Sequence, residues 1–249
     1  GAMSARKAFR ASIYHCVADP ARTPGDAATE YFEDGVLLVE DGRVAALGPA
    51  DDLLPVIGSD TSLEDLGGKL LLPGFIDCHV HCPQVDIIAS YGEQLLDWLN
   101  KYAYPAEMQF ADESHAREVA DFFLDELLRN GTTTAAVFAT VHPHSADTLF
   151  AAADERGMRL LGGKVLMDEH CPEALRDNPE SSYADSKALI EKWHGKGRLG
   201  YAITPRFALT SSEAQLEAAQ KNQQRRREQA ERFIERFRAK STKASQVQS

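Results

Sequence analysis

The chain has 249 residues, of which 43% are hydrophobic and 26% are charged, so it can bury the core of an ordinary globular protein. Its formal net charge of −11 disfavours nonspecific binding of the whole chain to nucleic acid, because phosphates attract basic surfaces. It has no apolar run of about 18 residues and no signal-peptide pattern at its N-terminus, which predicts a cytoplasmic protein without a membrane span.

Residues 1–72 are predicted to form a small β domain. Residues 1–3 are set aside, because Gly-Ala-Met is typical of the remnant that tag cleavage leaves. Short apolar runs at residues 36–39 and 44–47 lie on either side of an Asp-Gly pair. Asp-Gly between such runs favours a hairpin, since both central turn positions need positive φ.

Strand-like and helix-like runs alternate in residues 73–220. The alternation predicts a parallel sheet with right-handed crossovers. About four βα units are half of an eight-stranded barrel, which alone typically occupies about 250 residues. The predicted fold class is therefore α/β: an incomplete (β/α)8 TIM-type barrel with a small N-terminal β domain and a C-terminal helical tail. Strands are expected at residues 75–81, 133–140, 159–167 and 199–206. One helix is expected around an apolar stripe that extends from Ala116 to Leu128, with Gly131 as its stop, and further helices are expected at residues 146–156 and 183–193.

Residues 221–249 differ in character from the predicted barrel. Nine Lys or Arg residues against three Glu residues give this segment a charge of +6, which leaves −17 for the rest of the chain. Its composition of Gln, Arg, Lys, Glu, Ala and Ser favours a solvated helix. We therefore expect one long, exposed, basic helix.

Two pairs of histidines have the spacing of metal ligands. His79 and His81 end the first predicted strand, where alternate residues point to the same face, so both imidazoles can converge on one ion at the mouth of the barrel. His142 and His144 follow the second strand, but the proline between them interrupts regular pairing. Solvated or hydrogen-bonded loop histidines are the alternative for either pair, and the apolar strand before His79 favours the first pair as the metal site.

The segment Pro73–His81 resembles the metal-binding first strand of the amidohydrolase superfamily. Residues 95–107, 130–135 and 204–207 are similar to guanine deaminases, and the resemblance extends from about residue 9 to about residue 220. It implies a cytoplasmic enzyme of purine catabolism that uses zinc to hydrolyse guanine, its small-molecule substrate, to xanthine and ammonia. The zinc would lower the pKa of its bound water toward about 7.

The resemblance also assigns roles to five residues. His79 and His81 match the two metal ligands of the first strand, and Gln84 matches a substrate-binding glutamine. Arg206 and Phe207 match an arginine and a phenylalanine that hold the purine. A planar guanidinium suits the neighbouring O6 and N7 acceptors of guanine, and an aromatic ring can stack on the base. Without the resemblance, a surface ion pair and a core position would be the ordinary interpretations of these last two residues.

Other polar residues are weaker candidates. The run Asp168–Cys171 contains metal-ligand types, but a charged loop is the more ordinary interpretation. Trp98 is expected to pack within the long loop between the first strand and the first helix, and Glu107 is expected to order that loop rather than act as an acid.

The sequence departs from the family after the fourth strand. The family takes further histidines from its fifth and sixth strands, an aspartate from the eighth and a proton-shuttling glutamate near the fifth. This chain has no histidine after His194 and no aspartate after Asp185. The expectation is a single zinc ion that lacks its other ligands, no catalytic residue in this chain, and no activity of the chain alone. An open sheet edge also predicts a homodimer or aggregate.

Residues 221–249 resemble the helical linker between the two ATPase domains of ABC-F proteins, which in that family reaches into the ribosome. A gene fusion, an assembly error or a deliberate chimera would each explain such a junction. The alternative function is therefore a chimeric interaction protein whose basic helix contacts RNA or the ribosome, in which case nucleic acid binds through that helix.

Overall fold

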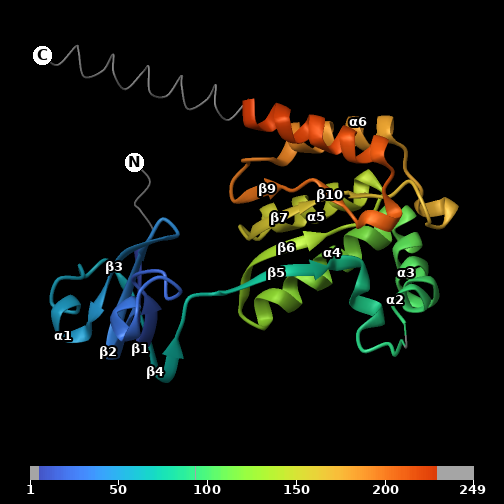
Figure 1. The fold of residues 1–249 in the computed structure, drawn as a ribbon. Coiled ribbons are helices and arrows are strands. Elements are labelled where there is room, and N and C mark those ends of the chain that lie inside the picture. The colour runs from blue at the N-terminus through green and yellow to red at the C-terminus, as the bar shows by residue number, and fades with distance from the viewer. Residues whose placement is uncertain (1–5, 93, 229–249) are drawn as a thin grey trace, which may run out of the picture. The chain divides into compact units, whose positions relative to one another are not determined.

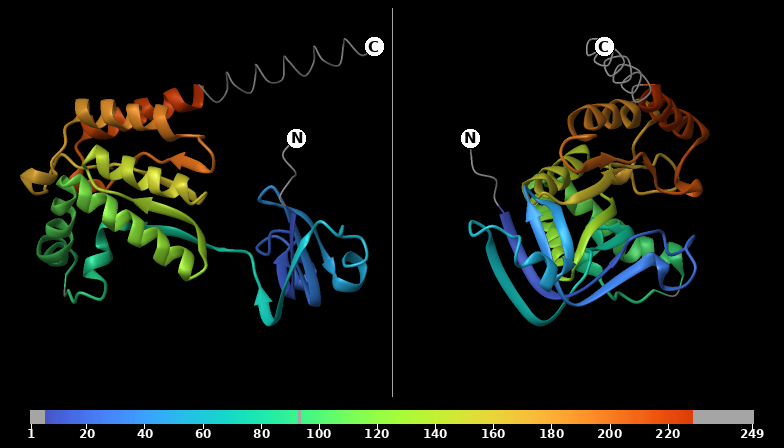
Figure 2. Two further views of the ribbon diagram at one scale, coloured as in Figure 1. Left: turned by 180° about the vertical axis from the view of Figure 1, so that it is seen from behind. Right: turned by 90° about the vertical axis from the view of Figure 1, so that its left-hand side faces the viewer.

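The computed structural model describes residues 6–92 and 94–228, and Figures 1 and 2 show them as a ribbon. The chain divides into two compact units, Gly1–Gly74 and Phe75–Ser249. Within the described residues, no helix combines the length and the apolar character needed to cross a membrane.

The N-terminal unit is a four-stranded sheet in the order β3-β2-β1-β4. Strand β2 pairs antiparallel with both β1 and β3, whereas β4 pairs parallel with β1. The predicted hairpin is confirmed, because Asp41 and Gly42 join β2 to β3 with positive φ values of 51° and 73°. The elements are β1 (Arg6–Cys16), a 3-10 turn (Gly25–Ala28), β2 (Thr29–Glu40), β3 (Arg43–Pro49), α1 (Ala50–Leu53) and β4 (Ser62–Leu71).

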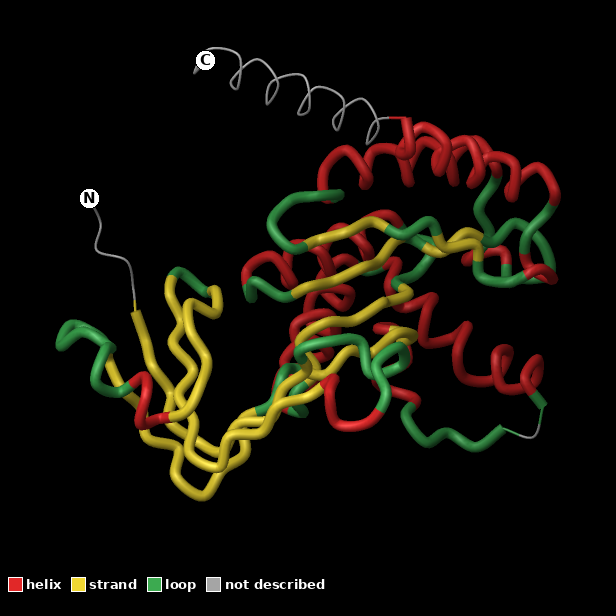
Figure 3. Tube along the Cα trace, turned by 60° about the vertical axis from the view of Figure 1, so that its left-hand side comes forward, coloured by secondary structure: helices red, strands yellow, loops and turns green. Residues whose placement is uncertain are grey.

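The second unit contains a parallel sheet in the order β5-β6-β7-β9, which is also the order of these strands along the chain. A parallel sheet that simply follows the chain is a segment of barrel wall. The α/β class and the parallel sheet are confirmed, and the barrel is incomplete over the described residues. Figure 3 shows the strands side by side. They are β5 (Phe75–His81), β6 (Thr132–Phe138), β7 (Arg159–Gly163) and β9 (Leu199–Tyr201).

The third and fourth predicted strands are each interrupted. The two-residue strands β8 (Val165–Leu166) and β10 (Thr204–Pro205) pair in parallel with each other beyond the main sheet. At the break, a Cβ on Gly163 would lie 2.0 Å from the carbonyl oxygen of Ala202, so only glycine permits this close backbone approach. The interruption matters for function because β10 leads directly into Arg206.

Helices α4 (Glu113–Arg129), α5 (Pro143–Glu155) and α6 (Pro179–Trp193) connect the strands. Helices α5 and α6 begin three and four residues before their predicted starts at residues 146 and 183. Asp112 caps α4 by accepting hydrogen bonds from the backbone N–H groups of residues 114 and 115. Helices α5 and α6 have proline in their first turn, where its missing N–H costs nothing. Pro143 therefore starts a helix here, whereas the sequence predicts only an interruption.

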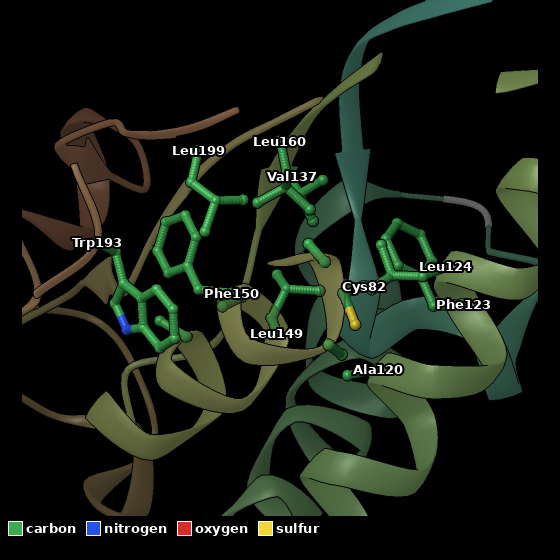
Figure 4. Close-up of a cluster of buried hydrophobic side chains, with 14 of the residues drawn as sticks. Cys82, Ala120, Phe123, Leu124, Val137, Leu149, Phe150, Leu160, Trp193 and Leu199 are labelled. Carbon is green, nitrogen blue, oxygen red and sulfur yellow. The ribbon is translucent and has the colours of Figure 1, made fainter. Parts of the chain in front are cut away.

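The main hydrophobic core lies between these helices and the sheet, as Figure 4 shows. The ring of Phe150 stacks on Trp193 and on Tyr201, with centroids 5.9 Å and 6.1 Å apart. The predicted apolar stripe of α4 is buried except at its end, where Leu128 is 37% exposed. Burying aromatic rings of this size dominates the energetics of such a core.

The segment between β5 and α4, expected to be a long loop, is largely helical. Short turns of different pitch follow one another: 3-10 at Cys82–Ile87, α2 (Leu95–Trp98), a π turn at Leu99–Ala103, α3 (Tyr104–Met108) and 3-10 at Gln109–Ala111. Leu99, Ala103 and Tyr104 are buried in a second core with residues after β7. Trp98 packs there as predicted, and its indole N–H donates to the carbonyl of Ser90 at 3.1 Å.

The described part of the predicted basic tail begins within a helix of residues 213–228. This part is not uniformly solvated. Asn222 is 2% exposed and donates to the carbonyl oxygen of Tyr183 at 3.1 Å, because α6 packs beside this helix. Residues 229–249, and with them most of the segment that resembles the ABC-F linker, lie outside the described residues.

The edge strand β9 has its hydrogen-bonding groups occupied, which corrects the expectation of an exposed sheet edge at the fourth strand. Ala202 N–H pairs with β7, so in a parallel ladder the groups of Leu199 and Tyr201 point the other way. The N–H of Tyr201 donates to His194 Nδ1 at 3.0 Å, and its carbonyl accepts from Arg226 Nη1 at 2.6 Å. The N–H and carbonyl of Leu199 are bonded within the turn of residues 195–199.

The opposite edge strand, β5, exposes apolar side chains. Phe75 and Ile76 are 58% and 67% exposed at the start of this strand. Exposed apolar residues beside an unpaired strand promote association. The predicted homodimer or aggregate stays a prediction, and the exposed apolar side chains of β5 are the surface that would favour it.

Candidate functional site

His79 and His81 lie at the carboxyl end of β5, with their rings on the same face of the sheet. Their Nε2 atoms are 3.3 Å apart, and the ring planes are inclined at 72°. Phe138, which ends β6, stacks on His81 at a centroid distance of 4.8 Å and contacts the edge of His79 at 5.3 Å. The predicted common face is confirmed, and the neighbouring strand fixes both imidazoles.

This spacing fits a shared zinc ion. Two nitrogens at Zn–N distances of about 2.0–2.1 Å and a tetrahedral angle lie about 3.3–3.4 Å apart. Burial, the Arg206 guanidinium and His79 lower the pKa of His81 to about 4, so its imidazole is neutral near pH 7 and can donate a lone pair. The two imidazoles are nevertheless only part of a zinc site, since residues 6–92 and 94–228 contain no group of three or more His, Cys, Asp or Glu residues arranged to hold a metal.

A cavity of about 920 Å³ brings together all five residues that the sequence analysis singled out. His79 and His81 contribute from β5, and Gln84 from the 3-10 turn that follows it. Arg206 and Phe207 reach the same cavity from the segment after β10. The five residues, which come from distant parts of the sequence, therefore line one cavity. The cavity also has apolar walls, including Val80, Ile88 and Phe122.

Arg206 is held in a buried ion pair. Its Nη1 lies 2.6 Å from each carboxylate oxygen of Glu107, and the two side chains are 5% and 0% exposed. Its guanidinium carbon lies 5.4 Å from the ring centroid of Tyr104. The surface ion pair considered for Arg206 is therefore wrong, because the pair is buried. Burial raises the pKa of Glu107 and Arg206 opposes that rise, so the carboxylate depends on the guanidinium for its charge.

Phe207 lies at the rim of the second core rather than inside it. It is partly buried against the cluster around Leu99 and Val165, and its backbone is fully extended, with φ −170° and ψ 170°. The position leaves part of the ring surface facing the cavity. The core position considered for Phe207 is therefore only partly correct.

The second histidine pair occupies a different environment. His142 and His144 stack with ring centroids 5.6 Å apart in the first turn of α5, and neither lines the 920 Å³ cavity. His144 Nε2 lies 2.5 Å from the carbonyl oxygen of Phe110, which fits a hydrogen-bonded histidine. His142 has no hydrogen-bond partner for its buried Nε2 within the described residues.

His142 supports a pH prediction. Burial, His144 and Lys164 lower its pKa below the ordinary value, so the folded chain resists a proton that the unfolded chain accepts near pH 6.5. The stability contributed by neutral His142 is complete above about pH 7.5 and is lost as the pH falls. We expect the urea midpoint of the metal-free chain to fall between pH 7.5 and pH 5.5. The variant His142→Gln should lose less over the same range, and an equal loss would contradict this assignment.

The run Asp168–Cys171 is structural. Asp168 accepts hydrogen bonds from the backbone N–H and the hydroxyl of Ser212. Ser212 Oγ in turn accepts from the backbone N–H of Gln215 and so caps the helix of residues 213–228. His170 Nδ1 lies 2.8 Å from the carbonyl oxygen of Leu209. These bonds join the loop after β8 to the loop after β10 and support the interpretation as a charged loop.

Sequence reasoning missed the pairing of Glu107 with Arg206. One local signal was available: Glu107 lies in an otherwise apolar helical turn, and a glutamate on such a turn needs a buried cation. Nothing in the sequence identifies which cation, because the partners are 99 residues apart.

Comparison with known proteins gives the family. Residues 70–231 match the model of the Amidohydrolase family. The chain is 51% identical over 195 residues to guanine deaminase from Escherichia coli strain K12, covering 78% of this chain and 44% of the relative. The solved E. coli guanine deaminase superposes with a TM-score of 0.84 at 48% identity, over 88% of this chain and 51% of that chain.

Two further solved structures share the fold. Guanine deaminase from C. acetobutylicum, which has guanine bound in its active site, superposes with a TM-score of 0.77 at 27% identity, over 89% of this chain and 51% of that one. An adenosine deaminase from Xanthomonas campestris with bound zinc superposes with a TM-score of 0.63 at 20% identity, over 79% and 42%.

The chain spans about half the length of the relatives it matches. The family match covers more than half of the chain and extends past residue 220, from residue 70 to residue 231. This chain belongs to the amidohydrolase family.

Proposed function

We propose that this chain is the guanine-binding part of a guanine deaminase, which hydrolyses guanine to xanthine and ammonia. The observation that carries the proposal is the convergence of Gln84, Arg206 and Phe207 on the cavity that contains His79 and His81. Identity of 51% to the E. coli guanine deaminase supports it.

Each polar group has a partner on guanine. Arg206 donates hydrogen bonds to the neighbouring acceptors O6 and N7, Phe207 stacks on the purine ring, and Gln84 both donates and accepts along the remaining edge. His79 and His81 would hold one zinc ion. The chemistry that zinc supplies when bound is activation of a water molecule for attack on the ring carbon that carries the amino group.

Zinc binding by the chain alone should be weak, because zinc sites normally use three or four protein ligands. We expect His79→Ala or His81→Ala to abolish the remaining affinity, measured by competition with a zinc-sensitive dye. His142→Ala is the matched control, since it removes one member of the other His-x-His pair and should leave zinc affinity unchanged. If only the control variant lost zinc affinity, the metal site would instead lie at the start of α5.

The substrate is tested in a completed enzyme. The chain, mixed with the C-terminal half of the E. coli guanine deaminase and zinc, should release ammonia from guanine and not from adenine. Adenine offers a donor where guanine offers O6, so Arg206 has no acceptor to bind there. Equal turnover of adenine, or ammonia release from neither base by a correctly assembled complex, would contradict the proposed function.

A further inference from the structure

The guanidinium of Arg206 is held on two sides by a single helical turn. Tyr104 and Glu107 are three residues apart in α3, a spacing that places both side chains on one face of a helix. The tyrosine ring contacts the guanidinium, and the glutamate binds its Nη1. Helix α3 also packs in the second core, through residues such as Ala103 and Tyr104. Tyr104 and Glu107 therefore hold Arg206 from a helix that is itself packed in the second core.

The contacts made by Glu107 divide the donors of Arg206 into two sets. Both carboxylate oxygens are bound to Nη1. Over the part of the chain that the structure describes, no other hydrogen bond to the guanidinium is recorded, so Nε and Nη2 are left to face the cavity that Arg206 lines. Because Nη1 is bound to a buried carboxylate, rotation of the planar guanidinium would break these hydrogen bonds, and its remaining donors keep a fixed direction.

We propose that Glu107 is a positioning residue that sets the purine specificity of this site, by aiming the free donors of Arg206 at the O6 and N7 edge of the base. The inference rests on the proposed function and extends it to a residue outside the cavity lining. Glu107 also neutralises the guanidinium, so the pair as a whole favours a neutral base over an anionic ligand. A lone buried guanidinium would attract anions instead.

The test uses the completed, zinc-loaded enzyme with Glu107→Gln, which keeps the side-chain shape and removes the charge. We expect KM for guanine to rise about 10- to 100-fold, as for a misplaced binding group, while kcat changes less than about threefold. The preference for guanine over 2-aminopurine, which lacks O6, should fall by a similar factor. An unchanged preference would overturn the proposal even if the variant were less stable.

A matched control separates positioning from folding. Asp177 forms another buried ion pair, with Lys164, and neither residue lines the cavity. Asp177→Asn should lower stability and leave KM and the guanine preference unchanged. A rise in KM as large as that of Glu107→Gln would show that buried-pair damage alone explains the effect.

A spectroscopic measurement on the chain itself distinguishes failure of this proposal from failure of the proposed function. Nitrogen NMR should show slow rotation of the Arg206 guanidinium, assigned by its absence in Arg206→Lys, and fast rotation in Glu107→Gln. If the completed enzyme ignores guanine, the proposed function fails, while slow rotation lost in the variant still supports the positioning. Identical spectra for the chain and Glu107→Gln would overturn the positioning itself.

Discussion

Arg206→Ala should lower the free energy of unfolding of this chain by about 3–5 kcal/mol, because it leaves the carboxylate of Glu107 buried without its partner. Glu107 is 0% exposed, so water cannot replace the lost hydrogen bonds without opening the fold. Chemical denaturation of the two proteins measures the difference. This expectation differs from the one that the sequence alone gives. A residue that only binds guanine could be replaced by alanine with far more damage to guanine turnover than to folding.

Two further variants make the Arg206 prediction specific. Arg225→Ala removes a partly exposed ion pair with Glu191 and should cost about 1 kcal/mol or less. The double variant Arg206→Met with Glu107→Leu removes both charges and should recover most of the loss, as apolar replacement of a buried pair generally does. If Arg206→Ala costs no more than Arg225→Ala, the carboxylate of Glu107 is not buried in solution.

The second large effect concerns activity. We expect the chain alone, with zinc added, to show no measurable guanine turnover. Two imidazoles leave zinc short of its usual three or four protein ligands, because the described residues contain no group of three or more His, Cys, Asp or Glu residues arranged to hold a metal. Loss of a proton-transfer group alone typically costs about 10²–10⁴ in rate.

Guanine consumption measured on the chain alone and on the complemented mixture tests this prediction. Activity only on mixing would agree with it. Turnover by the chain alone that survives repeated purification, and that is lost in His81→Ala, would refute it. The histidine variant is the necessary control, because traces of a host guanine deaminase would survive the same substitution.

Strand alternation and turn chemistry depend only on residues that are neighbours in the sequence, and the features that follow from them were predicted correctly. Alternation along a strand placed His79 and His81 on one face, and the Asp-Gly turn placed the hairpin at residues 41–42. The resemblance to guanine deaminases then placed Arg206 correctly beside the histidines. These features need no knowledge of distant contacts.

Prediction from the sequence was wrong where tertiary packing overrides the local sequence pattern. Residues 95–108 form helical turns of changing pitch, because Leu99, Ala103 and Tyr104 are buried against residues after β7. Prolines at 105 and 143 resemble breaks in the sequence but occupy first turns of helices. The Glu107 contact depends on that helical segment, so an error in the local structure concealed a residue of the site.

The side chains that cover β9 have a consequence for joining this chain to any further strand. His194 and Arg226 occupy the N–H and the carbonyl of Tyr201, which are the groups that a new parallel neighbour would bind. Growth of the sheet at this edge is therefore a displacement reaction, in which the incoming strand competes with two tethered side chains. A strand that offers only backbone hydrogen bonds gains little by displacing these side chains, so it does not pair with this edge. A strand that also makes other contacts compensates for the lost hydrogen bonds and can pair.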